Sequence, residues 1–102
     1  MISWNEKLFL GRYAAMDKRK IISNLSARKS HFGVYAIVLA TNEKDLLDVI
    51  SAFFLKDARY HKKNIEVVGL AIGRDEAFEV VRDIITEVYD KTGGFDVRGF
   101  FS

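Results

Sequence analysis

Three short segments of the sequence combine residues that can hold an anion with residues that suit the turn before a helix. They are Gly11-Arg12, Thr41-Asn42 and Gly73-Arg74-Asp75. Guanidinium groups and the free backbone N–H groups at the start of a helix both favour phosphate or carboxylate. In an open parallel sheet, such groups gather beyond the carboxyl ends of the strands. The sequence therefore predicts a site for a small anion there, although the same residues also suit ordinary turns.

A second group of residues with binding chemistry is a short basic and aromatic cluster. It consists of Arg59, Tyr60, His61, Lys62 and Lys63, and a further run of cations, Lys18 to Lys20, extends it. Cations contact phosphates and a tyrosine ring stacks on a base, so the cluster suggests nucleic acid. Against this, the chain has 14 acidic residues and a pI near 8.9, so it is not a strongly basic domain. Nucleic acid is therefore the least favoured of the partners considered.

The sequence offers no set of residues for catalysis or for metal binding. His31 and His61 are the only histidines, there is no cysteine, and no His-Glu-x-x-His spacing occurs. The glycines at 69 and 73 lack the spacing of a dinucleotide site or a P-loop. No nucleophile, base and orienting partner can be named. We therefore expect no catalytic residue, no metal and no cofactor, and an enzyme only if a partner chain completes the site.

Two apolar runs predict the central strands of the fold. Residues 32–40 and 65–72 are nearly unbroken runs of β-branched, aromatic and small apolar residues, which is typical of strands buried on both faces. Gly69 interrupts the second run, and a glycine inside a strand indicates a close approach or a bulge. Residues 95–98 alternate between apolar and charged residues, so they predict an edge strand with one wet face.

Helical spacing of apolar residues predicts the elements between the strands. Asn42 is a predicted N-cap for a helix that continues to Leu55, and residues 74–91 form a second amphipathic helix that ends at Gly93. Residues 56–64 form a polar connection. Near the start of the sequence, residues 7–11 predict a strand followed by a helix over 13–29, while the alternative is one long N-terminal helix.

These elements predict a small α/β domain over residues 1–102, with helices packed on a sheet of three or four mostly parallel strands. The element order is βαβαβαβ, or an N-terminal helix followed by βαβαβ. The length fits one domain, and 49% hydrophobic with 29% charged residues is the composition of a soluble protein. The absence of a secretory signal and of cysteine favours the cytoplasm and no membrane partner.

Charge and apolar residues together favour association as the function. Residues 1–31 carry seven Lys/Arg against two Asp/Glu, whereas residues 64–102 carry four against eight. The wide apolar arc of the predicted 42–55 helix and the aromatic pair near residue 100 suit an interface. The candidate interface residues are Leu46, Leu47, Ile50, Phe53, Phe54, Phe100 and Phe101. We expect a non-catalytic association module, either a homo-oligomer or an accessory subunit, with the small-anion binder as the alternative and nucleic-acid binding as the second alternative.

Overall fold

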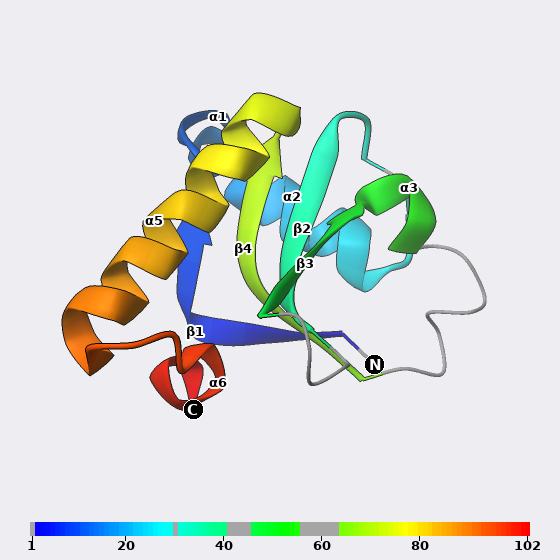
Figure 1. Cartoon of the computed structure of the whole chain (residues 1–102). Helices are drawn as coiled ribbons and strands as arrows, with labels where there is room; N and C mark the ends of the chain where they lie inside the picture. Colours follow the sequence, from blue (N-terminus) through cyan, green and yellow to red (C-terminus); the bar gives the residue numbers. More distant parts are fainter. Residues whose placement is uncertain (1, 30, 41–45, 56–63) are drawn as a thin grey trace.

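In the described part of the chain, four strands form one mixed sheet at the centre of the fold (Figure 1). The structure is a computed structural model that describes residues 2–29, 31–40, 46–55 and 64–102. The elements in chain order are β1 (Ile2–Leu10), α1 (Arg12–Met16), α2 (Lys18–Ser26), β2 (Val34–Leu39), β3 (Leu47–Ser51), α3 (Ala52–Leu55), β4 (Ile65–Ile72), α5 (Arg74–Thr92) and α6 (Val97–Phe101). The strand order across the sheet is β1-β4-β2-β3.

The sheet is mixed, and this corrects the expectation of mostly parallel strands in a βαβαβ order. Among the strands that the structure describes, only β1 and β4 run parallel, while β2 is antiparallel to both β4 and β3. The cause is the segment after β2, which returns as a strand directly beside it, with Leu39 paired to Leu47. An antiparallel return of this kind needs only a short connection and no crossover helix.

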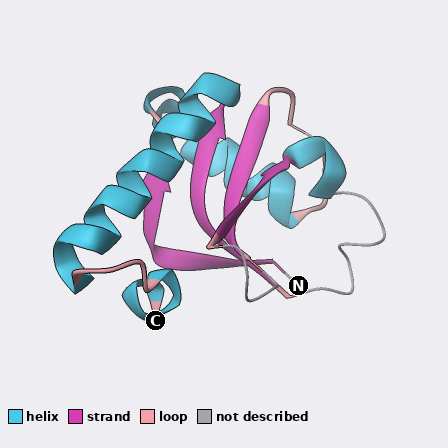
Figure 2. Ribbon diagram, in the orientation of Figure 1, coloured by secondary structure: helices cyan, strands magenta, loops and turns pink. Residues whose placement is uncertain are grey.

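Helices cover both faces of the sheet, so the protein has three layers (Figure 2). On one face, α1, α2 and α3 bury a cluster that includes Ile21, Leu25 and Leu55 against the sheet. On the other face, α5 and α6 bury a second cluster that includes Ile84 and Phe101. Strands β2 and β4 lie between the two clusters, which explains why their sequences are apolar almost throughout. In the described part of the chain, no helix has the length and apolarity that a membrane crossing requires.

Sequence patterns located β2, β4 and α5 closely. The predicted strand over 65–72 coincides with β4, and the predicted helix over 74–91 corresponds to α5. Gly93 ends α5 with a φ of 74°, a left-handed conformation that favours glycine. At Gly69, a Cβ would lie 2.9 Å from Val80 Cγ1 on α5, and the pairing of β2 with β4 shifts by one residue beside it. Both the close approach and the bulge are therefore confirmed.

Two predicted elements near the edges were wrong. The helix expected to run from Asn42 to Leu55 is instead, within the described residues, the strand β3 followed by the one-turn helix α3. Its apolar residues satisfy helical spacing, but they also fit a strand that contacts core on both faces. The edge strand expected at 95–98 is the start of α6, where the Asp96 side chain accepts a hydrogen bond from the Gly99 N–H at 3.0 Å.

The N-terminal segment is a strand followed by helices, so the alternative of one long helix was wrong. β1 begins earlier than expected, at Ile2, and the predicted helix over 13–29 is divided at Asp17 into α1 and α2. β1 is also irregular, because Trp4 pairs with Val67 and Phe9 with Gly69, so β1 advances five residues while β4 advances two. The additional residues bend the strand sharply (Figure 1).

Candidate functional site

The fold brings two of the three predicted anion-binding segments to one edge of the sheet. β1 and β4 are parallel neighbours, with Leu10 paired to Leu70, so the residues after both strands lie together. Here Gly11 is buried and its N–H donates to the Leu70 carbonyl at 2.9 Å. Beside it lies an open cavity of about 740 Å³, lined by Arg12, Tyr13, Ile72, Gly73, Arg74, Asp75, Glu76 and Glu79.

The Glu76 carboxylate lies at this edge of the sheet, beside Gly11. The Glu76 side chain, 8% exposed, accepts hydrogen bonds from the backbone N–H groups of Ile72 at 2.6 Å, Tyr13 at 2.7 Å and Ala14 at 3.3 Å. A Cβ on Gly11 would lie 2.2 Å from the Glu76 carboxyl carbon, so only glycine leaves room for this contact. Glu76 thus takes the place at the start of α1 that a bound anion was predicted to take.

The third predicted segment, Thr41-Asn42, lies outside the described residues. The strand before it nevertheless runs in the opposite direction to β4, because Val34 pairs with Ile72 and Val38 with Val67. The carboxyl end of β2 therefore points away from the edge that carries Arg12 and Arg74. The basic cluster of Arg59, Tyr60, His61, Lys62 and Lys63 also lies outside the described residues.

The seven predicted interface residues divide into internal and exposed groups. Leu47 and Ile50 are half-buried on opposite faces of β3, and Phe100 and Phe101 pack with Phe9 in the second core cluster. The remaining three are exposed, with Leu46 43%, Phe53 60% and Phe54 51% accessible. The C-terminal aromatic pair therefore packs within this chain, and the three exposed residues lie just before β3 and in α3.

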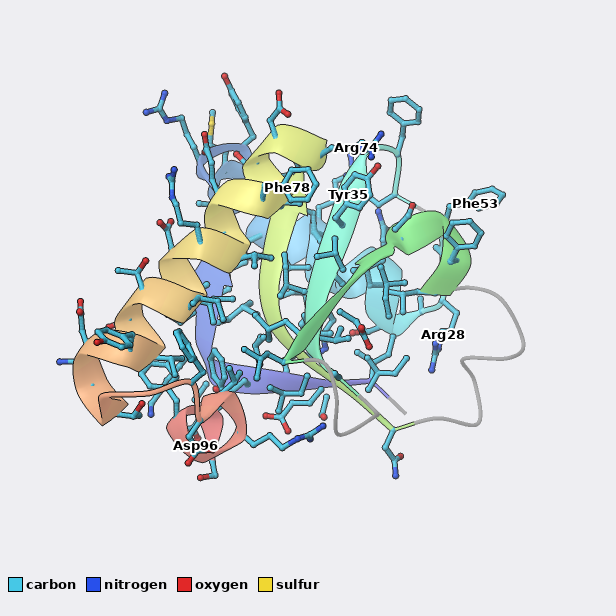
Figure 3. The ribbon with its side chains drawn as sticks, in the orientation of Figure 1. Arg28, Tyr35, Phe53, Arg74, Phe78 and Asp96 are labelled. Carbon is cyan, nitrogen blue, oxygen red and sulfur yellow. The ribbon has the colours of Figure 1, made fainter. Side chains whose placement is uncertain are left out.

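We call the surface around β3 and α3 the β3 face, and define it by Phe32, Tyr35, Val49, Phe53 and Phe54. Phe32 is fully exposed and Val49 is 42% exposed. Phe32, Tyr35 and Phe53 line one open cavity of about 620 Å³ together with His31, Gly33 and Ser51. Tyr35 pairs with Ser51 at the end of the sheet where β2 begins, and Figure 3 shows Tyr35 and Phe53 on this side of the molecule.

The outer edge of β3 lies beside these side chains and is open in the described part of the chain. β3 is the last strand of the sheet, and no strand in the described residues pairs with its outer side. Such an edge presents unpaired N–H and C=O groups that another strand can complete. Sequence reasoning missed Phe32, Tyr35 and Val49, because it placed the first two inside a buried strand and Val49 inside a helix.

The described residues contain one contact between a carboxylate and an imidazole. His31 Nε2 lies 3.6 Å from Asp17 Oδ2, and His31 Nδ1 lies 3.0 Å from Asn24 Nδ2. These contacts tie the segment before β2 to α2. Among the described residues, no group of three His, Cys, Asp or Glu side chains is placed to hold a metal ion.

Comparisons of the chain with protein families, with curated proteins and with solved structures find no significant match.

Proposed function

We propose that this protein works by self-association, most simply as a two-fold homodimer joined through the β3 face. The observation that carries the proposal is the coincidence of an open strand edge with large exposed apolar side chains. Phe32, Phe53 and Phe54 are each more than half exposed, and they lie beside a strand whose outer backbone groups can accept another strand. Large apolar groups clustered in this way on a surface mark an interaction site.

A second copy of the chain is the partner that the sequence of β3 fits. In an antiparallel pairing centred on Val49, that residue lies opposite its own copy and Asp48 lies opposite Ile50. The two carboxylates are therefore not placed directly opposite one another, which would be unfavourable. The pairing has two-fold symmetry, as an interface between identical patches requires. It extends the four-stranded sheet into one continuous sheet across both copies.

The test is the solution mass of the protein, measured by light scattering across a dilution series. The wild-type chain is expected to be a dimer that persists in high salt, because the proposed contact is apolar and backbone-mediated. Val49→Lys is expected to give a monomer, since a lysine on an edge strand blocks pairing. Leu46→Lys, also beside β3, provides a second variant if Val49→Lys does not fold.

The matched control is Met16→Lys, which places the same charge at an exposed apolar residue of α1, 80% accessible and away from the β3 face. This variant is expected to remain a dimer. A wild-type monomer at every concentration would refute the proposal, as would an equal loss of mass in the Val49 and Met16 variants.

A small anionic ligand at the Arg12 and Arg74 edge is the second candidate function. It is supported by the 740 Å³ cavity that both arginines line. It ranks second because Asp75, Glu76 and Glu79 line the same cavity and Glu76 already occupies the backbone N–H groups of α1. If the site binds phosphate, phosphate should raise the thermal stability of the wild-type chain and not that of Arg74→Ala. An unchanged response in Arg74→Ala would remove this candidate.

A further inference from the structure

The two faces of the sheet are covered by helical segments of opposite net charge. α1 and α2 cover one face of the sheet, while α5 covers the other. Residues 11–29 contain six Lys/Arg and a single acid, Asp17, whereas residues 74–92 contain six Asp/Glu and three Lys/Arg. The sheet therefore separates a basic helical layer from an acidic one. Figure 1 shows α2 and α5 on opposite faces of the sheet.

The outward side of α2 carries only polar groups. Its exposed side chains are Lys18, Arg19, Lys20, Ser23 and Ser26, which we call the α2 face. Its two fully buried residues, Ile21 and Leu25, point into the core. With 3.6 residues per turn, Arg19, Lys20 and Ser23 lie on the side of the helix opposite to that pair. Guanidinium, ammonium and hydroxyl groups are the side chains that most often contact phosphate oxygens.

Backbone groups at the start of α2 add to this positive surface. The first helical hydrogen bond runs from the Ile21 N–H to the Asp17 carbonyl at 3.0 Å, so the preceding N–H groups have no partner within the helix. The Asp17 side chain makes no capping hydrogen bond to them. It lies instead 3.6 Å from His31 Nε2. The one acidic residue of the 11–29 segment is thus turned toward a histidine, and the first turn of α2 itself carries three cations.

We propose that the α2 face binds the phosphate backbone of nucleic acid without reading its sequence. The contact uses charge, hydroxyl groups and the helix terminus, none of which distinguishes one base from another. An anionic membrane is the weaker fit, because the exposed side chains of α2 include no apolar group that would enter the acyl region. This site is separate from the β3 face, and neither proposal depends on the other.

The test measures binding of the whole chain to a short fluorescein-labelled DNA duplex by fluorescence anisotropy as sodium chloride is increased. Wild-type affinity is expected to fall with a slope of about −0.9 per phosphate contact in a plot of log K against log salt. In Arg19→Glu/Lys20→Glu, affinity at low salt should fall at least about tenfold and the slope should become shallower by about 2. Glutamates in the first turn of a helix also interact favourably with its dipole, so the fold should persist.

The matched control is Arg82→Glu/Lys91→Glu, which makes the same change in net charge at two exposed residues of α5 on the opposite face. It should keep most of the wild-type affinity and the wild-type slope. The corresponding pairs of glutamine variants repeat the comparison without new negative charge, should a glutamate pair fail to fold.

Three results would overturn the proposal. The first is no binding of the duplex by the wild-type chain at low salt, and the second is an equal loss of affinity in the α2 and α5 pairs, which would show an effect of net charge alone. The third is binding to phosphatidylserine vesicles without binding to the duplex, which would assign the α2 face to a membrane surface.

Discussion

The two edges of the sheet are built in different ways. At one edge, β1 is bent by additional residues, and its side chains hold the C-terminal helix: Asn5 Nδ2 donates to the Phe101 carbonyl at 2.8 Å and Lys7 Nζ to the Phe100 carbonyl at 2.8 Å. At the other edge, β3 is five residues long, regular in its pairing, and followed directly by the exposed rings of Phe53 and Phe54. Bends, charges and covering helices are the means by which proteins protect a strand edge from other chains.

Within the residues that the structure describes, this chain thus protects one edge of the sheet and leaves the other open. A protein that was selected only to stay monomeric would gain from protecting both. We therefore expect changes at the β1 edge to alter folding stability. Changes at the β3 edge should instead alter association and leave the stability of the single chain nearly unchanged.

The largest expected difference comes from the same substitution made at each edge. Phe101→Ala removes a ring that is 5% exposed and packs against Phe9 with ring centroids 5.9 Å apart, so it should lower the free energy of unfolding by about 3 kcal/mol. Phe54→Ala removes a ring that is 51% exposed and should cost less than about 1 kcal/mol. Urea denaturation at a protein concentration where the chain is monomeric measures both. Equal losses would show that the edges do not differ.

Removing the buried carboxylate of Glu76, which lies where β1 and β4 end, should have the next largest effect. Glu76→Ala leaves the N–H groups of Ile72, Tyr13 and Ala14 without their acceptor, so the free energy of unfolding should fall by about 2 to 3 kcal/mol. Glu79→Ala, an exposed residue on the same helix, is the control and should be nearly neutral. If the two variants had the same urea midpoint, Glu76 would not secure the start of α1.

The smallest expected effect is at the hydrogen bonds that hold α6 to β1. Asn5→Ala removes bonds to the Phe101 carbonyl and to Glu66 Oε2, the latter at 2.6 Å, both in part-buried positions. We expect a loss of about 1 kcal/mol in the free energy of unfolding, together with faster amide hydrogen exchange in α6. Asn64→Ala is the exposed control. Unchanged exchange in α6 would mean that its aromatic packing alone holds it.

Sequence periodicity was sufficient for the elements at the centre of the fold. β4 and α5 were predicted closely because a strand between two core clusters is apolar throughout and a long surface helix has one apolar side. Periodicity failed for β3, where residues 46, 47, 50, 53 and 54 fit the spacing of a helix as well as they fit a strand followed by a helical turn. Strand direction failed for the same reason, because a helix expected after β2 implied a parallel return.

The candidate sites were predictable to different degrees. Arg12 and Arg74 meet at one edge as predicted, since this required only that β1 and β4 be parallel. The role of Glu76 was missed, although a signal was present: it precedes Val80 and Ile84 at steps of four residues, which places it on the buried side of α5. The β3 face was missed because exposure depends on which strand is last in the sheet, and strand order is not encoded in local periodicity.

The contact between β1 and α6 also bears on the order in which the chain folds. β2 and β3 join residues close in sequence, whereas β1 pairs with a strand about sixty residues away and its Asn5 bonds to a residue 96 positions later. Closing long loops has a high entropic cost, so the hairpin should form early and β1 should dock late. During synthesis, β1 leaves the ribosome before β4, so its strand partner is absent until residues 65–72 follow, and its bonds to α6 form later still.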